Sequence, residues 1–318
     1  MPHFTQKVEP RGAVLGLDIA KDTVAIHDSV TSTYRVVDNK PAALRKVFRA
    51  CIGYDLALCE STGGYERPAL DAAWELGLPI HRADPSKAKA FITSHGGNAK
   101  TDKADAQWLA RMALERGESL ARWSPPDPDI EVLACLVRHR DDLLRQRTQA
   151  KNRLSAPNRG PVAKLLRAEI KFLTNQIKTL DEQMAQCRAK PAIKPRSDVL
   201  LAIPGIGPVV ANTLIGLLPE IGALTRRQVA SLCGLAPHPR DSGQFTGKRR
   251  TYGGRCELKT ALFMAALSVS RTCPTLSAYY DKLIDAGKPK MVALTAIARK
   301  IAVIANARVR DANLAEAN

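Results

Sequence analysis

Residues 13–19, "AVLGLDI", form a continuous apolar run that a single charged residue, Asp18, interrupts. A Lys-Asp pair follows, and then the stretch "TVAIHDSV" at residues 23–30. This pattern predicts a buried strand, a tight turn and a second strand. Because a charge inside an apolar strand is costly unless it is paired or binds a metal ion, Asp18 is a candidate functional residue.

Strand and helix patterns alternate after this stretch. "DLALCES" at residues 55–61 predicts a short apolar strand that ends at Glu60, and "YERPALDAAWELG" at 65–77 predicts an amphipathic helix. "LPIHRAD" at 78–84 predicts a further strand, and "TDKADAQWLARMALERG" at 101–117 predicts a further helix. The alternation indicates an α/β domain built around a central sheet.

The proline-rich stretch "WSPPDPDI" at residues 123–130 ends this alternation and marks a domain boundary. Beyond it, apolar residues repeat with the 4-3 spacing of a coiled-coil seam: Leu166, Ile170, Leu173, Ile177, Leu180, Met184 and Cys187. "SAPNRGP" at 155–161 separates this segment from an upstream one in the same register, which predicts an antiparallel helical hairpin. Its Lys- and Arg-rich faces suit a solvated spacer, a binding arm or an oligomerisation element.

A second linker, "KPAIKPR" at residues 190–196, is followed by a helical pattern that continues to the end of the chain. We therefore predict three parts. They are an α/β domain over residues 1–125, a coiled-coil hairpin over 126–192, and a mainly α-helical domain over 193–318.

The charge balance of the 318-residue chain indicates a polyanionic partner. Lys and Arg number 48 against 31 Asp and Glu, which gives a formal net charge of +17. A basic surface gains affinity for nucleic acid by releasing condensed counterions. Aromatic residues make up only 5% of the chain, which disfavours a base-stacking platform and favours contacts to the backbone and grooves of the nucleic acid.

The compartment follows from what the sequence lacks. No run of 18 apolar residues occurs, and the N-terminus "MPHFTQKVEPRG" has no apolar signal-peptide core, so we expect a cytoplasmic protein with no membrane partner. The seven cysteines form no C-x-x-C pair and have no histidine at zinc spacing, which predicts buried free thiols.

Four carboxylates form the first candidate site. Asp18 and Glu60 lie on predicted strands, and Asp102 and Asp105 share one face of the first turn of a predicted helix. Converging acids repel one another unless cations neutralise them, and hard oxygen ligands suit Mg²⁺ or Mn²⁺. Such a cluster in a basic protein resembles an RNase H-like nuclease core, which cleaves phosphodiesters with two metal ions. Alternatively, Asp102 caps its helix and Asp18 hydrogen-bonds the following turn.

"LLAIPGIGPVVANTLI" at residues 200–215 has the hydrophobic–Gly–hydrophobic–Gly pattern of a helix-hairpin-helix. Gly205 and Gly207 would let the backbone approach a DNA phosphate, which the N–H groups at the start of the next helix would bind. The alternative is a simple turn between two helices.

"PHPRDSGQFTGKRR" at residues 237–250 is a polar loop with Ser242 in its middle. By itself this serine is a turn residue, because a hydroxyl needs a base or metal ion to become a nucleophile and none is evident nearby. Basic residues in this loop and just after it are candidate phosphate contacts; the alternative is that they form an ordinary solvated surface. They are Lys248, Arg249, Arg250 and Arg255.

Seven blocks occur together in this order: "GLDIAKDTV", "CESTGGYERPAL", "AKTDKADAQWLA", "IPGIGPVVA", "CGLAPHPRDSGQFTGKRR", "YGGRCELKTALFMAAL" and "YYDKLIDAGKPKMVALTAIARKI". They resemble the DEDD transposases of the insertion sequence 110 family, including its 1111-like subgroup, over nearly the whole chain. The resemblance implies a resolvase-like RNase H fold whose DEDD metal tetrad is Asp18, Glu60, Asp102 and Asp105.

The same resemblance assigns Ser242 to the family's serine, which is proposed to attack DNA and form a covalent phosphoserine link beside the metal cluster of another protomer. It also implies a structured bridge RNA that pairs with donor and target DNA. We therefore expect a metal-dependent, RNA-guided DNA recombinase that acts as a dimer or tetramer, associated with the bacterial nucleoid. The alternatives are a metal-dependent nuclease or junction resolvase in which Ser242 is structural, and a non-catalytic nucleic-acid-binding protein.

Overall fold

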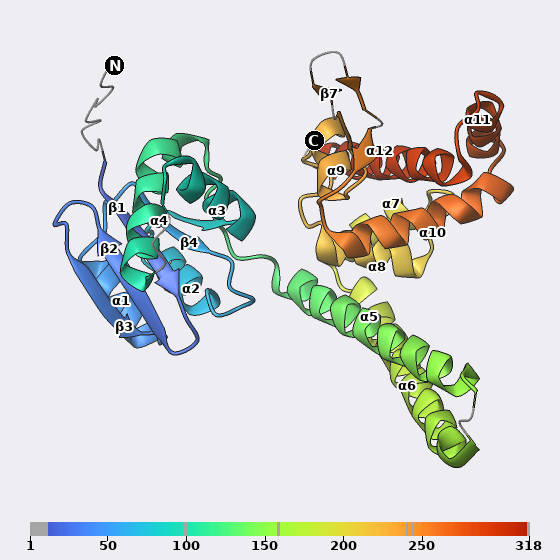
Figure 1. Cartoon of the computed structure of the whole chain (residues 1–318), viewed down its shortest axis with the longest axis horizontal. Coiled ribbons are helices and arrows are strands. Elements are labelled where there is room, and N and C mark those ends of the chain that lie inside the picture. The colour runs from blue at the N-terminus through green and yellow to red at the C-terminus, as the bar shows by residue number, and fades with distance from the viewer. Residues whose placement is uncertain are drawn as a thin grey trace. The chain divides into compact units, whose positions relative to one another are not determined.

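The computed structural model describes residues 12–97, 101–157, 160–239, 241–242, 245–247 and 249–316. The chain forms two compact units, Met1–Pro125 and Pro126–Asn318 (Figure 1). Each unit has its own hydrophobic core. No helix in these described ranges is both long enough and apolar enough to span a membrane.

A mixed five-stranded sheet forms the centre of the first unit. Its strands are β1 (Val14–Ile19), β2 (Thr23–Asp28), β3 (Tyr34–Asp38), β4 (Leu56–Glu60) and β5 (Ile80–Ala83), in the order β3-β2-β1-β4-β5. The first three strands pair antiparallel, and β4 and β5 continue the sheet parallel to β1. The predicted α/β class with a central sheet is confirmed for this unit.

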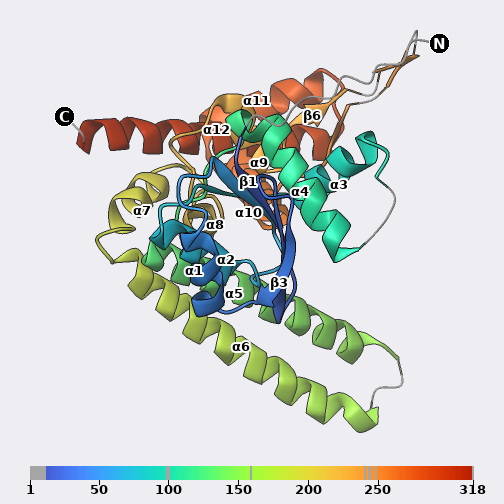
Figure 2. The same cartoon turned by 90° about the vertical axis from the view of Figure 1, so that its left-hand side faces the viewer.

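Helices cover both faces of this sheet (Figure 2). One face packs against α1 (Pro41–Arg49) and α2 (Arg67–Glu75), and the other against α3 (Pro85–Ser94) and α4 (Asp102–Arg116). A short 3-10 turn at Gly117–Ser119 follows α4. Because side chains alternate along a strand, Val14, Gly16 and Asp18 of β1 all face the α4 side.

Gly16 allows α4 to lie directly on the sheet. A Cβ atom at this position would overlap the carbonyl oxygen of Ala106 and the backbone nitrogen of Ala110. Only a residue without a side chain permits so close an approach of strand and helix. The glycine therefore determines how near the first turn of α4 comes to the end of β1.

The second unit is mainly helical, as predicted. Its helices are α5 (Pro128–Ser155), α6 (Gly160–Arg188), α7 (Lys194–Leu201), α8 (Pro208–Leu217), α9 (Arg226–Leu232), α10 (Cys256–Thr272), α11 (Pro274–Asp285) and α12 (Lys290–Glu316). The stretch that the sequence indicated as a loop also contains two short antiparallel pairs. These are β6 (Pro237–His238) with β9 (Arg250–Thr251), and β7 (Asp241–Ser242) with β8 (Phe245–Thr246). Two-residue strands carry too little periodicity to be predicted.

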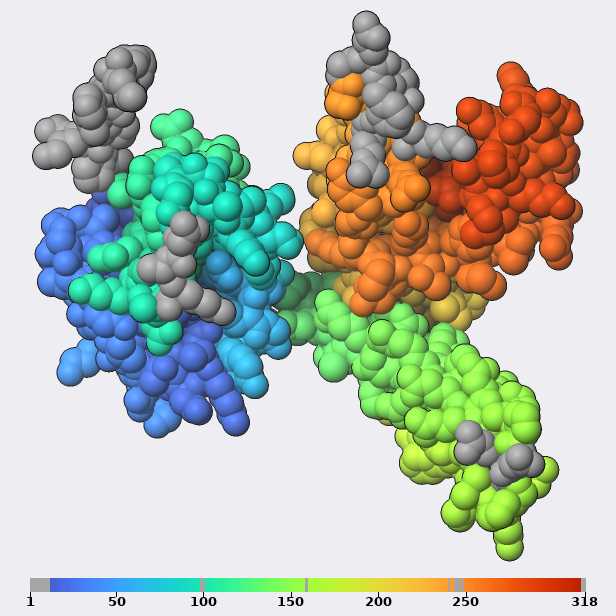
Figure 3. All heavy atoms as spheres, viewed as in Figure 1, coloured from blue at the N-terminus to red at the C-terminus, as the bar shows by residue number. Residues whose placement is uncertain are grey.

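Helices α5 and α6 lie side by side and antiparallel, and extend from the rest of their unit (Figures 1 and 3). The Nε of Arg140 donates to Asp181 at 2.7 Å across their interface. Six of the seven residues predicted for the seam of α6 are buried, and Ile170 is half-buried. The base of the pair shares the core of the other helices through residues such as Leu133 and Met184, so it packs as part of the second unit.

The cysteines are all free thiols, but they are not all buried. Cys51, Cys59, Cys187 and Cys233 are buried, whereas Cys273 is half-buried and Cys135 and Cys256 are exposed. The prediction of buried thiols is therefore wrong for the last three. Cys135 and Cys256 lie on outward-facing positions of α5 and α10, and Cys273 lies between α10 and α11; the number and spacing of cysteines do not reveal this.

Candidate catalytic residues

Asp18 and Glu60 end two neighbouring parallel strands. Leu17 of β1 is in register with Cys59 of β4, so Asp18 and Glu60 are the next residues on their strands and point to the same face of the sheet. Both are half-buried. The parallel register thus places the first two predicted carboxylates beside each other, on the side covered by α4.

The first turn of α4 supplies the other two predicted carboxylates. Thr101 is the N-cap, and its hydroxyl accepts a hydrogen bond from the Ala104 amide at 3.2 Å. Asp102 is therefore not the cap that its local sequence also suggested; it is an exposed residue of the first turn. Asp105, one residue before the contact with Gly16, is half-buried.

The electrostatics of Glu60 identify which acids gather around it. Burial raises the pKa of Glu60 above its ordinary value, and the negative charges of Asp18, Asp105 and Asp84 raise it further. Three carboxylates are thus near enough to Glu60 to disfavour its ionised form. Asp102 is not among them.

Asp84 was not selected from the sequence, although a structural signal for it exists. Glu60 pairs with Ala83 of β5, so Asp84 follows at the same edge of the sheet. Its side chain caps α3 by accepting from the amides of Ser86 at 2.9 Å and Lys87 at 3.2 Å. The local pattern indicates the cap, and only the register of β4 with β5 places the same carboxylate near Glu60.

The donor chemistry of this cluster suits a hard divalent cation, because carboxylate oxygens are the ligands that Mg²⁺ and Mn²⁺ prefer. A cation would also relieve the repulsion that raises the pKa of Glu60. However, among the described residues no group of three or more His, Cys, Asp or Glu side chains is arranged to hold a metal ion. The structure therefore provides the charges and their approximate placement, without a closed ligand set.

In the second unit, residues 202–207 join α7 to α8. Gly205 has φ = +83°, and a Cβ atom there would collide with the side chain of Val269 on α10. The glycine is thus required by chain conformation and by packing against α10. Gly207 precedes α8 with open space around it. A hollow of about 550 Å³ is lined by Leu201, Ala202, Ile203, Pro204, Gly205, Ile206, Gly207 and Ser268.

Ser242 lies on β7, in register with Phe245, and is exposed. No described residue forms a hydrogen bond with its hydroxyl. The Asp241 carboxylate accepts from the Gly247 amide at 3.2 Å, and the His238 ring lies 4.2 Å from that of Tyr252. Neither Asp241 nor His238, the two neighbours that could serve as a base, forms a hydrogen bond with Ser242.

The basic residues near Ser242 differ in their surroundings. Arg249 and Arg250 are exposed, whereas Lys248 lies outside the described residues. Arg255 donates to both carboxylate oxygens of Glu220 at 2.7 and 2.9 Å and to the Leu217 carbonyl at 2.6 Å. Hydrogen bonds to Glu220 raise the pKa of Arg255 despite its burial. These hydrogen bonds compete with the phosphate contact predicted for this guanidinium, whose side chain is 37% exposed.

Comparison with known proteins identifies relatives over most of the chain. A family model described as "Transposase", of the DEDD type of IS110, matches residues 15–157, and a model described as "Transposase IS116/IS110/IS902 family" matches residues 197–281. The pilin gene-inverting protein of Moraxella lacunata is 31% identical over 262 residues, 80% of each chain. An uncharacterized 43.6 kDa protein of insertion element IS110 from Streptomyces coelicolor is 24% identical and covers 97% of this chain and 96% of its own.

Among solved structures, RuvC of Thermus thermophilus matches 35% of this chain and 99% of its own, with 15% identity and a TM-score of 0.29. The family models and the Moraxella relative, taken with the sheet and helices described above, establish the relationship. This chain belongs to the IS110 family of transposases.

Proposed function

We propose that this transposase cleaves and exchanges DNA strands with a carboxylate-bound divalent cation, Mg²⁺ or Mn²⁺, and with Ser242 as the nucleophile. The observation that carries the proposal is the convergence of Asp18 and Glu60, from adjacent strands, with Asp105 from α4. We place Asp102 in the same set because it precedes Asp105 by one helical turn. The unit that holds them has the strand order that we assign to an RNase H-like domain.

The proposed chemistry conserves phosphodiester bonds. The Ser242 oxygen forms a bond to phosphorus, the bond from phosphorus to one of its ester oxygens breaks, and the released oxygen takes up a proton. The serine phosphodiester that results can be attacked by a second DNA end, which joins strands without net hydrolysis. A bound cation supplies positive charge to the phosphate on which negative charge develops.

The exposure of Ser242 supports this role, because a nucleophile for DNA must be reachable by a bulky substrate. Neither Asp241 nor His238 hydrogen-bonds Ser242, so we place the proton acceptor in the assembled complex. We propose that the complex is a homo-oligomer, a dimer or tetramer, in which the carboxylates of one protomer meet the serine of another.

Guidance by a structured bridge RNA, as in the 1111-like subgroup, is the second half of the proposal. The net charge of +17 supports binding to polyanions, and we propose that these include the RNA as well as the donor and target DNA. The exposed Arg249 and Arg250, with Lys248, are the proposed phosphate contacts of the serine-bearing segment. Gly205 and Gly207 are proposed to bring the turn before α8 to a DNA phosphate. The name of the Moraxella relative describes inversion of a gene, which is also a strand exchange.

Two substitutions separate this proposal from its alternatives. Ser242→Ala should abolish strand exchange and a trapped protein–DNA adduct, and Asp18→Asn should abolish both as well. Cleavage that survives Ser242→Ala but not Asp18→Asn would instead support a metal-dependent nuclease or junction resolvase. Unchanged behaviour of both variants in every DNA assay would leave only a nucleic-acid-binding protein.

A further inference from the structure

The loop that follows Glu60 is folded around a buried carboxylate. Glu66, only 3% exposed, accepts hydrogen bonds from the amides of Thr62 at 3.1 Å and Gly64 at 2.8 Å. The hydroxyls of Thr62, at 3.0 Å, and Ser61, at 3.3 Å, donate to the same carboxylate. Arg82 of β5 adds a charge at 3.6 Å.

These donors offset the cost of burying Glu66. Burial by itself favours the neutral acid, but hydrogen bonds from the backbone amides of Glu66, Gly64 and Thr62 hold the pKa of Glu66 below its ordinary value. Gly63 at φ = +76° and Gly64 at φ = +116° adopt conformations that other residues rarely adopt. A fully bonded buried carboxylate in such a loop specifies one conformation for the residues directly after Glu60.

A second side chain connects this loop to the end of β1. The Nδ2 group of Asn39 donates to the Tyr65 carbonyl at 2.9 Å and to the Ala20 carbonyl at 3.0 Å. Ala20 lies two residues after Asp18, and Tyr65 lies in the loop after Glu60. Asn39 therefore links the two backbone segments that leave the two carboxylate-bearing strands.

We propose that Glu66 is a positioning residue which, with Asn39, sets the placement of the Glu60 carboxylate relative to that of Asp18. The inference rests on the proposed function, in which those two carboxylates hold a divalent cation. Glu66 does not touch the cation; it fixes the chain from which a ligand projects. Loss of residues that orient metal ligands lowers metal affinity by about 10–100-fold.

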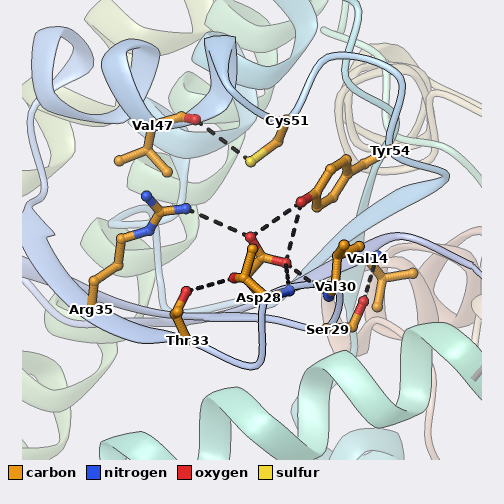
Figure 4. Close-up of polar contacts among 10 residues, drawn as sticks. Val14, Asp28, Ser29, Val30, Thr33, Arg35, Val47, Cys51 and Tyr54 are labelled. Carbon is orange, nitrogen blue, oxygen red and sulfur yellow. Dashed lines mark hydrogen bonds and ion pairs between the residues drawn. The ribbon is translucent and has the colours of Figure 1, made fainter.

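The same unit contains a matched control in Asp28 (Figure 4). This residue is also 3% exposed, and it accepts from the Val30 amide at 2.9 Å and the Tyr54 hydroxyl at 3.2 Å, with Arg35 at 3.9 Å. It pairs with Leu15, at the opposite end of β1 from Asp18. Asp28 and Glu66 are thus equally buried carboxylates with similar donors, and only Glu66 adjoins the proposed site.

The test measures Mn²⁺ binding by titration calorimetry of the full chain, together with the urea midpoint of each metal-free variant. Glu66→Gln and Asp28→Asn should lower the urea midpoint by similar amounts. Glu66→Gln should also weaken Mn²⁺ binding by about 10–100-fold, whereas Asp28→Asn should leave the Mn²⁺ affinity within about twofold of wild type. Asn39→Ser, at a half-buried position, should also weaken Mn²⁺ binding. This variant keeps the test decisive if Glu66→Gln does not fold.

Wild-type Mn²⁺ affinity in both Glu66→Gln and Asn39→Ser would overturn the inference, and so would an equal loss of affinity in Asp28→Asn. Failure of the proposed function has a different signature. In that case wild type would not bind Mn²⁺, or Asp18→Asn would bind it as wild type does.

Discussion

Replacing Gly16 by alanine perturbs the contact that brings α4 to the end of β1. The new methyl group would overlap backbone atoms of Ala106 and Ala110. Helix backbone cannot rotate aside as a flexible side chain can, so the whole of α4 must move outward. Restoring ordinary contact distances of roughly 3.5 Å requires a shift of about 1 Å or more.

This shift should affect both the free energy of unfolding and the rate of DNA cleavage. Overpacking of a close-packed core costs about 1–3 kcal/mol of unfolding free energy, which a folded domain can tolerate. Misplacement by about 1 Å near a reacting centre costs about 100-fold in rate. Asp105 directly precedes Ala106, so the shift moves its carboxylate away from those of Asp18 and Glu60. We expect Gly16→Ala to fold and to cleave DNA about 100-fold more slowly than wild type.

The assay combines the DNA cleavage rate with tryptophan fluorescence in urea. All three tryptophans, Trp74, Trp108 and Trp123, lie in the first unit, so fluorescence reports its unfolding. Gly117→Ala, at the other end of α4, is the matched control, because a Cβ atom there meets only a Leu56 methyl at 3.5 Å and φ is −50°. Wild-type cleavage by Gly16→Ala, or an equal loss in Gly117→Ala, would refute the reasoning.

Three further predictions concern other parts of the chain. The pKa of Glu60 is raised above the ordinary glutamate pKa of 4.5, so its negative charge destabilises the metal-free fold as pH rises above 4.5. Glu60→Gln should therefore raise the urea midpoint near neutral pH in the presence of EDTA. That gain should vanish below pH 4.5, and a gain independent of pH would contradict the cause. Replacing Arg249 and Arg250 by alanine should reduce the slope of log affinity for DNA against log salt concentration by about one ion per residue. Arg255→Ala should leave that slope unchanged and lower the urea midpoint of the second unit, followed by circular dichroism. Gly205→Ala should destabilise the second unit by about 1–3 kcal/mol through strain and overlap with α10, and an unchanged midpoint would disprove that packing.

The sequence was informative where a single local pattern determines position. An apolar strand with one aspartate and a later apolar strand that ends in glutamate predict two acids at one sheet edge once parallel pairing is assumed. The burial of six of the seven regularly spaced apolar residues of α6 follows from spacing in the same way, while their role as a coiled-coil seam stays a prediction. In both cases the residues that the spacing predicts to face the core are those that bury apolar surface.

What was missed depends on contacts between distant segments. Asp84 has the local pattern of a helix cap, which it also is, and only the pairing of β5 with β4 brings it to Glu60. Glu66 lies in the polar segment "STGGYER" at residues 61–67, where nothing in its neighbours indicates that it is buried. Arg255 was a candidate phosphate contact because it is basic and follows the polar loop, yet its guanidinium hydrogen-bonds Glu220, which lies 35 residues earlier in the chain. Charge and local spacing identify candidates, while tertiary pairing decides which of them remain available to a ligand.

The first unit maintains an unfavourable arrangement, in which several carboxylates lie near one another around Glu60. Glu60 is half-buried among like charges, and its burial and the repulsion from Asp18, Asp105 and Asp84 together raise its pKa. The hydrophobic cores on both faces of the sheet and the close contact of α4 with β1 hold the acids together nonetheless. If the proposed function holds, a cation that binds these carboxylates stabilises the folded state, because its charge offsets their repulsion. Added Mg²⁺ should therefore raise the urea midpoint of the wild-type first unit and leave that of Glu60→Gln nearly unchanged; an equal rise in both would show that the cation binds elsewhere.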